Sequence, residues 1–502
     1  MIIVIFYSFT LIVFPTPSLS HQIVFRPLMQ ELAKRGHEVT VITPNPAFPK
    51  GQSPENLTEI DVHDVSYNVW NKYLLIEKGK ADDNFKQMKL VFELIGAVFE
   101  EQMRSLEVQK LIHDKKRKFD LLFTETCARP SLSFSFLYKV PVIEFSSLSG
   151  LIGTFENIGA AIQPLIYPIS TQKRLFNLTL WEKISGLQLY YNFNRMYDKL
   201  EISENKMLKN IFGPDIPDLN ELRKNVHMLF LNVHPIWDFN RPVPPNVIYL
   251  GGLHQKPAEE LPQDLKLFLD SSKHGVIYLS FGTNMKPSLL APEKIKIFTE
   301  AFSQLPYEGL WKWDKELPEC PKNIKMSKWF PQPDLLKHPK VKLFITQGGL
   351  QSTDEALTAG VPLIGIPMHA DQWFNTEQYV IHKIGLMLNL ETLTVKELKN
   401  AINDVINNPS YRENVNDLRN FMYDKPLQPL EHAIWWTEYV LRHGGASRLR
   451  TPAAHMYWTE YFEIEIVISL LVSIITLASS MIVIAVYFIR KLRQYRCKVK
   501  VK

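Results

Sequence analysis

Short apolar runs alternate with longer amphipathic segments along most of this chain, and turn residues separate them. In the N-terminal part, residues 11–14 and 39–43 have the apolar, β-branched character of buried strands. Between them, residues 22–35 repeat apolar positions at helical spacing, with Ser20 as a candidate N-cap and Gly36 as a stop signal. A strand, a helix and a second strand in this order predict a parallel sheet.

The same alternation returns in the C-terminal half of the chain. Residues 276–280, 310–313, 341–346 and 361–366 have strand character, and residues 292–304 have the spacing of a helix. Strands that alternate with helices again indicate a parallel sheet covered by helices. We therefore predict two doubly wound α/β units in one chain.

One turn of this second unit has the features of an anion site. The strand at residues 341–346 is followed by Gly348 and Gly349, and the run Ser352-Thr353-Asp354-Glu355 then opens a helix that Gly360 stops. A glycine turn before a helix leaves unpaired backbone N–H groups and the positive end of the helix dipole at one point. The pattern predicts a phosphorylated ligand.

A set of residues at fixed spacing around this turn resembles the donor-binding signature of the UDP-glycosyltransferases. The resemblance covers nearly the whole chain and is strongest to the membrane-bound animal branch, with residues 344–349 similar to its arthropod members. It implies an α/β chain of the GT-B class, in which two doubly wound Rossmann-like domains face a cleft, and a role in detoxification. The matching positions are Trp329-x-Pro331-Gln332, His338, Gly348-Gly349, Glu355-Ala356, Gly360-Val361-Pro362, Pro367 and Asp371-Gln372.

The resemblance also implies roles for individual residues. Trp329 would stack on uracil, Gln332 would bond the uracil or the ribose, and Glu355 would accept hydrogen bonds from the ribose hydroxyls. The UDP-sugar is a co-substrate, and neither a cofactor nor a metal is expected. The remaining donor contacts fall to Gly282, Thr283, Gln347, Gly349, Gln351 and Ser352 at the diphosphate and to Asp371 and Gln372 at the sugar hydroxyls.

Several of these residues also have an ordinary structural interpretation. Ser352 and Glu355 match a helix capping box, and Trp329 alone would more often be a core residue. The pair Asp371-Gln372 alone would be an ordinary loop. Most relatives have His where this chain has Gln347, and glutamine keeps a hydrogen-bond donor but carries no charge. We interpret this difference as altered diphosphate contact rather than lost activity.

His21 and Glu125 are the candidate catalytic residues. His21 follows the first strand, and Glu125 ends the strand at residues 121–124, so both belong at the carboxyl edge of one parallel sheet, where open α/β sheets bind ligands. Sugar transfer to a hydroxyl needs a neutral imidazole to take the proton and a carboxylate to orient the ring. Taken alone, His21 would more often be a capping or surface residue. The resemblance implies that His21 is the base and Glu125 its partner, at a position where relatives usually have Asp.

The acceptor site is expected in residues 59–118 and 151–220, which are aromatic-rich and match the family least. An aromatic pocket near a membrane suits small lipophilic alcohols and phenols, although any single aromatic residue is more often part of an ordinary core. Attack opposite the departing UDP inverts the anomeric centre, and no carboxylate is a candidate nucleophile for retention. Arthropod relatives mainly use UDP-glucose, which favours glucose as the hexose. The aromatic residues include Phe92, Phe99, Phe155, Tyr190 and Tyr191.

A membrane helix is predicted near the C-terminus. Residues 466–489 contain no charged residue and are apolar on all sides, whereas a buried helix of a soluble protein of that length would show a polar stripe. Arg490, Lys491 and Arg493 follow directly, which predicts a cytosolic tail and a luminal body. The lysine pattern at residues 498–502 resembles a retrieval signal to the endoplasmic reticulum. The acceptor sequons at Asn56 and Asn177 fit a luminal glycoprotein.

Charge and cysteine content limit the classes of partner and of site that the chain can have. The net charge is +5, but residues 490–502 hold seven of the basic residues, which leaves 50 basic against 52 acidic residues and argues against a nucleic-acid partner. Three cysteines are too few for a disulfide framework. Cys127 and Cys320 are interpreted as buried apolar residues, and Cys497 is a candidate for acylation. No metal-ligand cluster is visible, so dipoles and side chains must neutralise the diphosphate.

Two other functions compete with the transferase hypothesis. A catalytically impaired, membrane-anchored lipophile-binding protein of the same fold is suggested by Gln347 and Glu125, and a single-pass receptor would leave the donor signature unexplained. A homo-oligomer is compatible with the sequence. The expected division is an acceptor-binding domain (1–240, with 1–14 a candidate signal remnant), a linker (241–262), a UDP-sugar-binding domain (263–428), closing helices (429–463), a transmembrane helix (464–489) and a basic tail (490–502).

Overall fold

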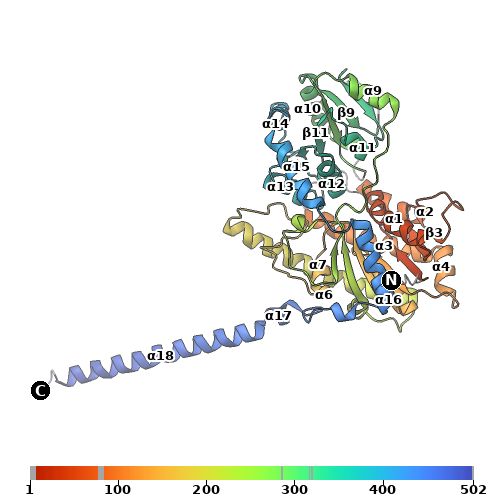
Figure 1. The fold of residues 1–502 in the computed structure, drawn as a ribbon. Helices are drawn as coiled ribbons and strands as arrows, with labels where there is room; N and C mark the ends of the chain where they lie inside the picture. Colours follow the sequence, from red (N-terminus) through yellow and green to blue (C-terminus); the bar gives the residue numbers. More distant parts are fainter. Residues whose placement is uncertain (1–6, 77–83, 284–286, 316, 318–319, 500–502) are drawn as a thin grey trace.

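The computed structural model describes residues 7–76, 84–283, 287–315, 317 and 320–499. Two α/β lobes lie one above the other, and a single long helix projects from the lower lobe (Figure 1). The first six residues of the candidate signal remnant and the last three residues of the tail lie outside the described residues.

The first lobe is built on a seven-stranded sheet in the order β3-β2-β1-β4-β5-β6-β7. All neighbouring strands pair in parallel. Because the chain adds β2 and β3 on one side of β1 and then returns to place β4 on the other, the strand order reverses between β1 and β4. The strands are β1 (Phe9–Val13), β2 (Glu38–Thr43), β3 (Leu57–Asp61), β4 (Leu121–Glu125), β5 (Val142–Ser146), β6 (Val226–Leu231) and β7 (Val247–Tyr249).

Helix α1 (Leu19–Lys34) covers one face of this sheet through aromatic packing. The ring of Phe25 lies 3.8 Å from that of Phe14 and 4.8 Å from that of Phe145, measured between centroids. Full burial of one such ring contributes about 1.5–3 kcal/mol. The other helices of the lobe are α2 (His63–Ile76), α3 (Asn84–Arg104), α4 (Leu106–His113), α5 (Ser133–Tyr138), α6 (Thr154–Ile158), α7 (Leu180–Phe212) and α8 (Leu219–Leu222).

The second lobe repeats the same design with six parallel strands in the order β10-β9-β8-β11-β12-β13. Its strand order reverses between β8 and β11. The strands are β8 (Val276–Ser280), β9 (Glu308–Lys312), β10 (Ile324–Ser327), β11 (Val341–Thr346), β12 (Leu363–Gly365) and β13 (Gly385–Met387). The helices are α9 (Gln263–Ser271), α10 (Pro292–Ser303), α11 (Gln332–Leu336), α12 (Leu350–Ala359), α13 (Gln372–Ile381), α14 (Val395–Asn407) and α15 (Ser410–Tyr423).

Three local expectations differ from the structure. Helix α1 begins at Leu19 with Ser18 as N-cap, so Ser20 lies inside the helix. Helix α12 begins at Leu350 after Gly349, so Ser352 is not an N-cap and the capping-box interpretation is wrong. In both cases the helix starts earlier because its first turn follows the strand closely, which local sequence signals do not fix. The segment expected as a linker at residues 241–262 contains β7, which forms the edge of the first sheet.

The chain returns to the first lobe after α15. Helix α16 (Pro429–His443) lies beside α1 (Figure 1). Arg35, at the end of α1, donates to the carboxylate of Glu431 at 2.7 and 2.9 Å. Further along, Arg450 donates to the backbone carbonyls of Lys224 and Val226, next to β6. The C-terminal segment is therefore attached to the N-terminal lobe.

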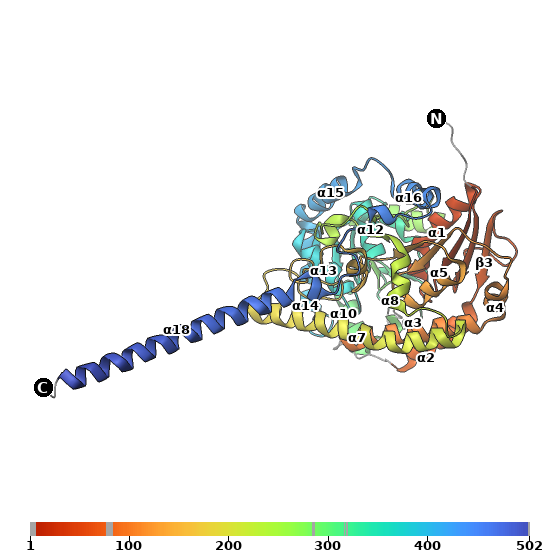
Figure 2. The same ribbon diagram turned by 90° about the horizontal axis from the view of Figure 1, so that it is seen from below.

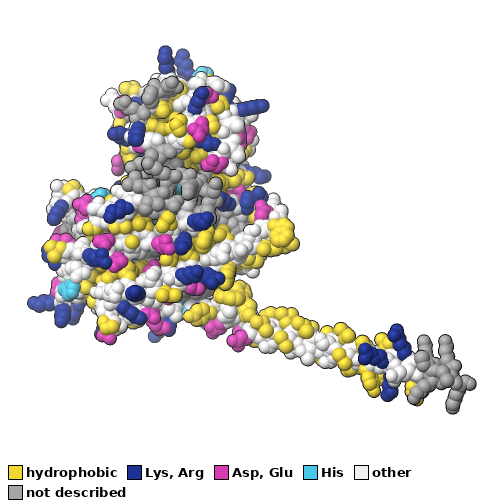
Figure 3. All heavy atoms as spheres, turned by 180° about the vertical axis from the view of Figure 1, so that it is seen from behind, with side chains coloured by type: hydrophobic (Ala, Val, Ile, Leu, Met, Phe, Trp, Pro, Cys, Tyr) yellow, Lys and Arg dark blue, Asp and Glu magenta, His cyan; other side chains and the backbone are white. Residues whose placement is uncertain are grey.

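The last helix, α18 (Ile464–Val499), leaves the body of the protein entirely (Figure 2). It is the one helix of the described chain that is long and apolar enough to cross a membrane, and its apolar window has no buried residue. On the face seen in Figure 3, apolar side chains lie along the helix and basic side chains follow near its end. Just before it, α17 (Trp458–Tyr461) exposes Trp458.

Candidate active site

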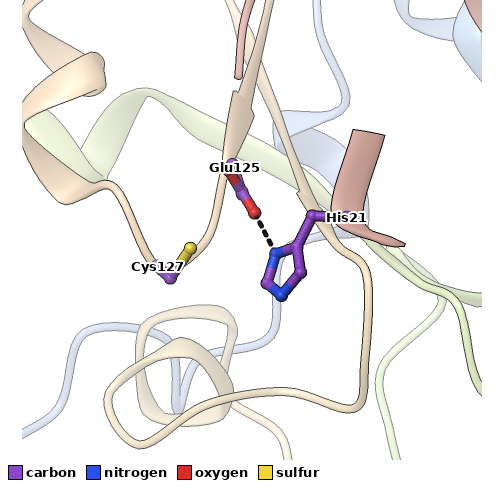
Figure 4. Close-up of side chains that lie close together, drawn as sticks. All are labelled: His21, Glu125 and Cys127. Atoms are coloured by element: carbon purple, nitrogen blue, oxygen red, sulfur yellow. Dashed lines mark hydrogen bonds and ion pairs between the residues drawn. The ribbon is translucent and has the colours of Figure 1, made fainter. Parts of the chain in front are cut away.

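The candidate base lies where the strand order of the first sheet reverses. His21 is in the first turn of α1, just after β1, and Glu125 is the last residue of β4. Nδ1 of His21 is 2.6 Å from Oε1 of Glu125, and the second ring nitrogen lies on the opposite side of the ring (Figure 4). The sheet topology therefore brings together two residues that are 104 positions apart in sequence.

The two side chains of this pair differ in burial, and burial affects the pKa of the carboxyl group. The side chain of Glu125 is 1% exposed and that of His21 is 23% exposed. Burial alone would raise the pKa of Glu125, but the hydrogen bond and charge of His21, with smaller effects from Thr16 and Cys127, bring that pKa below its usual range. The carboxylate is therefore ionised at neutral pH, and it holds the proton of the neutral imidazole on Nδ1. The other nitrogen is left free to accept a proton.

A third residue of the first lobe, Ser147, also contacts the histidine. It follows β5, the next strand after β4, and its Oγ lies 3.0 Å from Nδ1 of His21. The backbone carbonyl of Ser147 accepts a hydrogen bond from Nε2 of Gln351 at 3.1 Å. Gln351 stands at the start of α12 in the second lobe. Ser147 thus touches both the candidate base and a candidate donor-binding residue.

The turns after β8 and β11 meet at the reversal point of the second sheet. Gly282 has φ of +76°, a backbone conformation that favours glycine, and a Cβ there would lie 2.3 Å from Nε2 of Gln347, which would have to move. Gly348 has φ of +89°, and a Cβ added there would lie 2.4 Å from Cγ2 of Thr376. Gly349 then caps α12, whose first-turn N–H groups lack intrahelical partners. Gln347 itself is buried, and Thr283 is exposed beside Gly282.

Trp329 is exposed, which excludes its interpretation as a core residue. Its side chain is 56% exposed, and Nζ of Lys312 lies 4.5 Å from the ring centroid. The same ammonium donates to the carbonyl of Gly282 at 3.0 Å, and burial lowers its pKa. Lys312 was not expected from the sequence. The feature that could have indicated it is its place as the last residue of β9, at the same carboxyl edge of the sheet as Gly282.

Gln332 and Glu355 form one hydrogen-bonded unit. The amide nitrogen of Gln332 donates to Glu355 Oε2 at 2.7 Å and to Ser352 Oγ at 3.0 Å. Its amide oxygen accepts from the hydroxyl of Tyr278 at 3.1 Å. Gln332 therefore orients Glu355, in addition to any ligand contact. Burial raises the pKa of Glu355 to about 7.

Asp371 and Gln372 shape the loop before α13. Gln372 Oε1 accepts from the backbone N–H groups of Met368 and His369, both at 2.9 Å. Asp371 accepts from Asn375 at 2.7 Å, and burial raises its pKa to about 6, while the charge of His21 lowers it. The charge of His21 in the first lobe therefore acts on a carboxyl group of the second lobe.

An apolar cluster borders the histidine and glutamate. Phe92, Phe193 and Met196 of α3 and α7 are buried together there, with Leu151 and Cys127 packed at their edge. Of the other aromatic residues expected in the acceptor site, Phe99 and Phe155 are buried, Tyr190 donates to Glu156 and Tyr191 is exposed.

Both described cysteines differ from their expected burial. Cys127 and Cys320 are half-buried rather than enclosed, because Cys127 stands in the turn that follows β4 and Cys320 in the segment that precedes β10. The structure also assembles a group that spacing did not reveal. The ligand atoms of His21, Glu125 and Cys127 all lie within 4.8 Å of one another (Figure 4).

Comparisons with known proteins identify the family that this chain resembles. A family model described as "UDP-glucoronosyl and UDP-glucosyl transferase" matches residues 10–499. An ecdysteroid UDP-glucosyltransferase of Spodoptera littoralis nuclear polyhedrosis virus is 37% identical over 92% of this chain and 94% of that protein. UDP-glucosyltransferase 2 of Dactylopius coccus is 31% identical over 92% of this chain and 90% of its own length.

Solved structures show the same fold at low sequence identity. A UDP-glucosyltransferase from Polygonum tinctorium, capable of glucosylating indoxyl, superposes with a TM-score of 0.58 at 16% identity, over 87% of this chain and 98% of that one. The calicheamicin glycosyltransferase CalG4 gives a TM-score of 0.58, also at 16% identity, over 87% of this chain and 99% of that one. Both likenesses support the GT-B arrangement of two parallel sheets.

Proposed function

The chain belongs to the family of UDP-glucuronosyl and UDP-glucosyl transferases, and on that basis we propose that it moves glucose from UDP-glucose to a hydroxyl of a small lipophilic acceptor. The single observation that carries the proposed mechanism is the 2.6 Å contact between His21 Nδ1 and Glu125 Oε1 at the reversal point of the first sheet. UDP-sugar transfer itself follows from the family, whereas the hexose, the acceptor and the residue roles are the proposal.

In the proposed reaction, His21 acts as the general base. Its free ring nitrogen takes the proton of the acceptor hydroxyl while the hydroxyl oxygen attacks the anomeric carbon. The bond from that carbon to the diphosphate breaks, and UDP leaves with the bonding electrons. Glu125 stabilises the imidazolium that forms, and because attack comes from the side opposite UDP, an α-linked donor gives a β-glucoside.

The donor is proposed to lie along the carboxyl edge of the second sheet. The exposed ring of Trp329 offers a face for uracil, and Glu355, held by Gln332, accepts from the ribose. The first-turn N–H groups of α12 and the ammonium of Lys312 face the diphosphate region, where charge must be neutralised. Thr283, Gln347, Gly349 and Ser352 would complete the diphosphate site, with Asp371 and Gln372 at the sugar.

The acceptor is proposed to enter from the apolar side of His21. The cluster around Phe92, Phe193 and Met196 lies beside Cys127, whose ligand atom is within 4.8 Å of those of His21 and Glu125. An apolar wall next to the base suits a lipophilic alcohol or phenol. The names of several viral relatives make an ecdysteroid a rational first member of an acceptor panel.

The protein is proposed to sit in the endoplasmic reticulum membrane with a luminal body. Helix α18 supplies one span, and Arg490 and Lys491 at its end would remain in the cytosol.

An acceptor screen on membranes that contain the full chain tests the function. Radiolabelled UDP-glucose, UDP-glucuronate and UDP-galactose would each be offered with an ecdysteroid, a simple phenol and a long-chain alcohol, and the product anomer would be identified by NMR. A β-glucoside formed from UDP-glucose supports the proposal. UDP-glucose binding without product across the panel would favour the impaired lipophile-binding protein, and an α-glucoside would exclude the inverting mechanism.

A further inference from the structure

The catalytic pair has a third neighbour with ligand chemistry of its own. Cys127 stands two residues after Glu125, in the turn that follows β4, and its Sγ points toward the pair (Figure 4). The three ligand atoms, one each from His21, Glu125 and Cys127, all lie within 4.8 Å of one another. Sγ also lies 3.3 Å from the hydroxyl of Thr16, which holds the thiol in place.

We propose that His21, Glu125 and Cys127 form an inhibitory site for a soft divalent cation such as Zn²⁺ or Cd²⁺. This inference goes beyond the proposed transferase function, and its inhibition arm rests on that function.

The donor atoms fit such an ion in type and spacing. An imidazole nitrogen, a carboxylate oxygen and a thiolate sulfur are ligands that Zn²⁺ and Cd²⁺ accept, whereas Mg²⁺ prefers oxygen ligands alone. Tetrahedral bonding at about 2.0–2.3 Å places neighbouring ligand atoms about 3.3–3.8 Å apart. The observed group needs His21 Nδ1 and Glu125 Oε1 to separate from their present 2.6 Å by about 1 Å. The partly exposed His21 and Cys127 leave a path for entry.

Coordination would switch off the base through the tautomer of the imidazole. In the metal-free pair Glu125 holds the ring proton on Nδ1, so the other nitrogen can accept the acceptor's proton. A metal ion bound at Nδ1 displaces that proton to Nε2, because the neutral ring carries one proton. The thiol proton of Cys127 is released to solvent, since the thiolate is the ligand. The ring then has no free nitrogen with which to deprotonate a hydroxyl.

Two expected results distinguish inhibition at this site from nonspecific inhibition of the enzyme by metal ions. The UDP-sugar contacts proposed for Trp329, Glu355 and Lys312 lie in the other lobe, so donor affinity should survive while turnover is lost. The effect should depend on Cys127 and not on Cys320, which is half-buried in the second lobe and packs against its core.

The test uses the full chain in membranes or detergent and the variants Cys127→Ser, Cys320→Ser and Cys497→Ser. Serine keeps a hydroxyl for hydrogen bonding but removes the soft sulfur ligand. Each variant's rate is measured against its own metal-free rate while Cd²⁺ or Zn²⁺ is added, with Mg²⁺ as a control ion and a chelator to reverse the effect. Binding is followed separately by the ultraviolet charge-transfer band of a cadmium thiolate.

We expect reversible loss of kcat at unchanged KM for UDP-glucose, with inhibition at least tenfold weaker in Cys127→Ser and unchanged in Cys320→Ser and Cys497→Ser. The thiolate band should appear in the wild type and in Cys320→Ser and lose its main component in Cys127→Ser. The inference is overturned by equal inhibition of Cys127→Ser, by stimulation instead of inhibition, or by a band that Cys127→Ser leaves intact. Because the band needs no turnover, it also decides the matter if the proposed transferase reaction fails.

Discussion

The side-chain amide of Gln351 donates a hydrogen bond of 3.1 Å to the backbone carbonyl of Ser147, so a residue of the second lobe holds a residue of the first. The hydroxyl of Ser147 in turn lies 3.0 Å from Nδ1 of His21. A contact at the start of α12 is thereby connected through one residue to the candidate base. Two variants separate the parts of this connection.

Ser147→Ala should lower kcat by about tenfold, because His21 loses the contact with the hydroxyl of Ser147 while Glu125 still orients the ring. KM for UDP-glucose should stay close to its wild-type value, since the backbone carbonyl that accepts from Gln351 remains. Gln351→Ala is the matched variant. Because it removes the hydrogen bond to Ser147 and a proposed donor contact, it should lower kcat and also raise KM for UDP-glucose. Steady-state rates with varied UDP-glucose distinguish the two, and a Ser147→Ala enzyme altered only in KM would contradict the assignment.

Shortening the carboxylate tests the geometry of the catalytic pair. Glu125→Asp keeps the charge but withdraws Oε1 from its 2.6 Å contact with His21 by about one carbon–carbon bond. We expect kcat to fall by about 10²-fold, as for other misplacements of this size. Glu125→Gln keeps the length of the side chain and loses its charge, and its kcat should fall by on the order of 10²–10⁴-fold. A fully active Glu125→Asp would mean that the backbone readjusts or that the pair does not limit turnover.

Donor binding should weaken at acidic pH because of Glu355. Burial raises its pKa to about 7, and the ionised carboxylate accepts hydrogen bonds from the ribose hydroxyls more strongly than the protonated carboxyl does. As pH falls below about 7, a growing share of the free enzyme must lose a proton to bind UDP-glucose, so Kd should rise toward about tenfold per pH unit. Glu355→Gln should bind more weakly at every pH but with a flatter profile. Calorimetric Kd values between about pH 6 and 8 provide the comparison, and an equally steep profile in Glu355→Gln would point to Asp371 instead.

The two glycosylation sequons should not be used equally. Asn177 is exposed in the loop before α7, whereas Asn56 is half-buried and donates through its amide to the carbonyl of Ala33 at 3.4 Å. We expect Asn177→Gln to abolish the mobility shift that endoglycosidase produces on gels of the expressed protein. Asn56→Gln should leave that shift in place. If the wild-type chain shows no shift at all in cells that glycosylate secreted proteins, the proposed luminal orientation fails.

The sequence predicted correctly the position of candidate residues that lie at the ends of strands. The position of Glu125 at the end of β4 and the start of α1 near His21 placed both residues at one sheet edge, and the structure joins them by a hydrogen bond. Strand β11 coincides with the expected residues because an apolar β-branched run ended by two glycines leaves little alternative. The resemblance to UDP-glycosyltransferases and the GT-B fold are confirmed by the family match and by the structural neighbours.

What the sequence missed depends on contacts between distant elements. Nothing local distinguishes Ser147 from other serines in its loop, and its importance arises only because β5 lies next to β4. Lys312 looked like an ordinary basic residue until β9 placed it over Trp329. The carboxylate, imidazole and thiol of the proposed metal site come from two segments 104 or more positions apart, so no spacing rule could reveal them.

Transfer and donor binding measured together in His21→Ala test the central claim most directly. If His21 is the base for a sugar bound in the second lobe, the variant should form glucoside at least 10²-fold more slowly than the wild type. Its calorimetric Kd for UDP-glucose should stay within about twofold, because none of the proposed donor contacts is removed. Glucoside formation by His21→Ala at the wild-type rate would contradict the account.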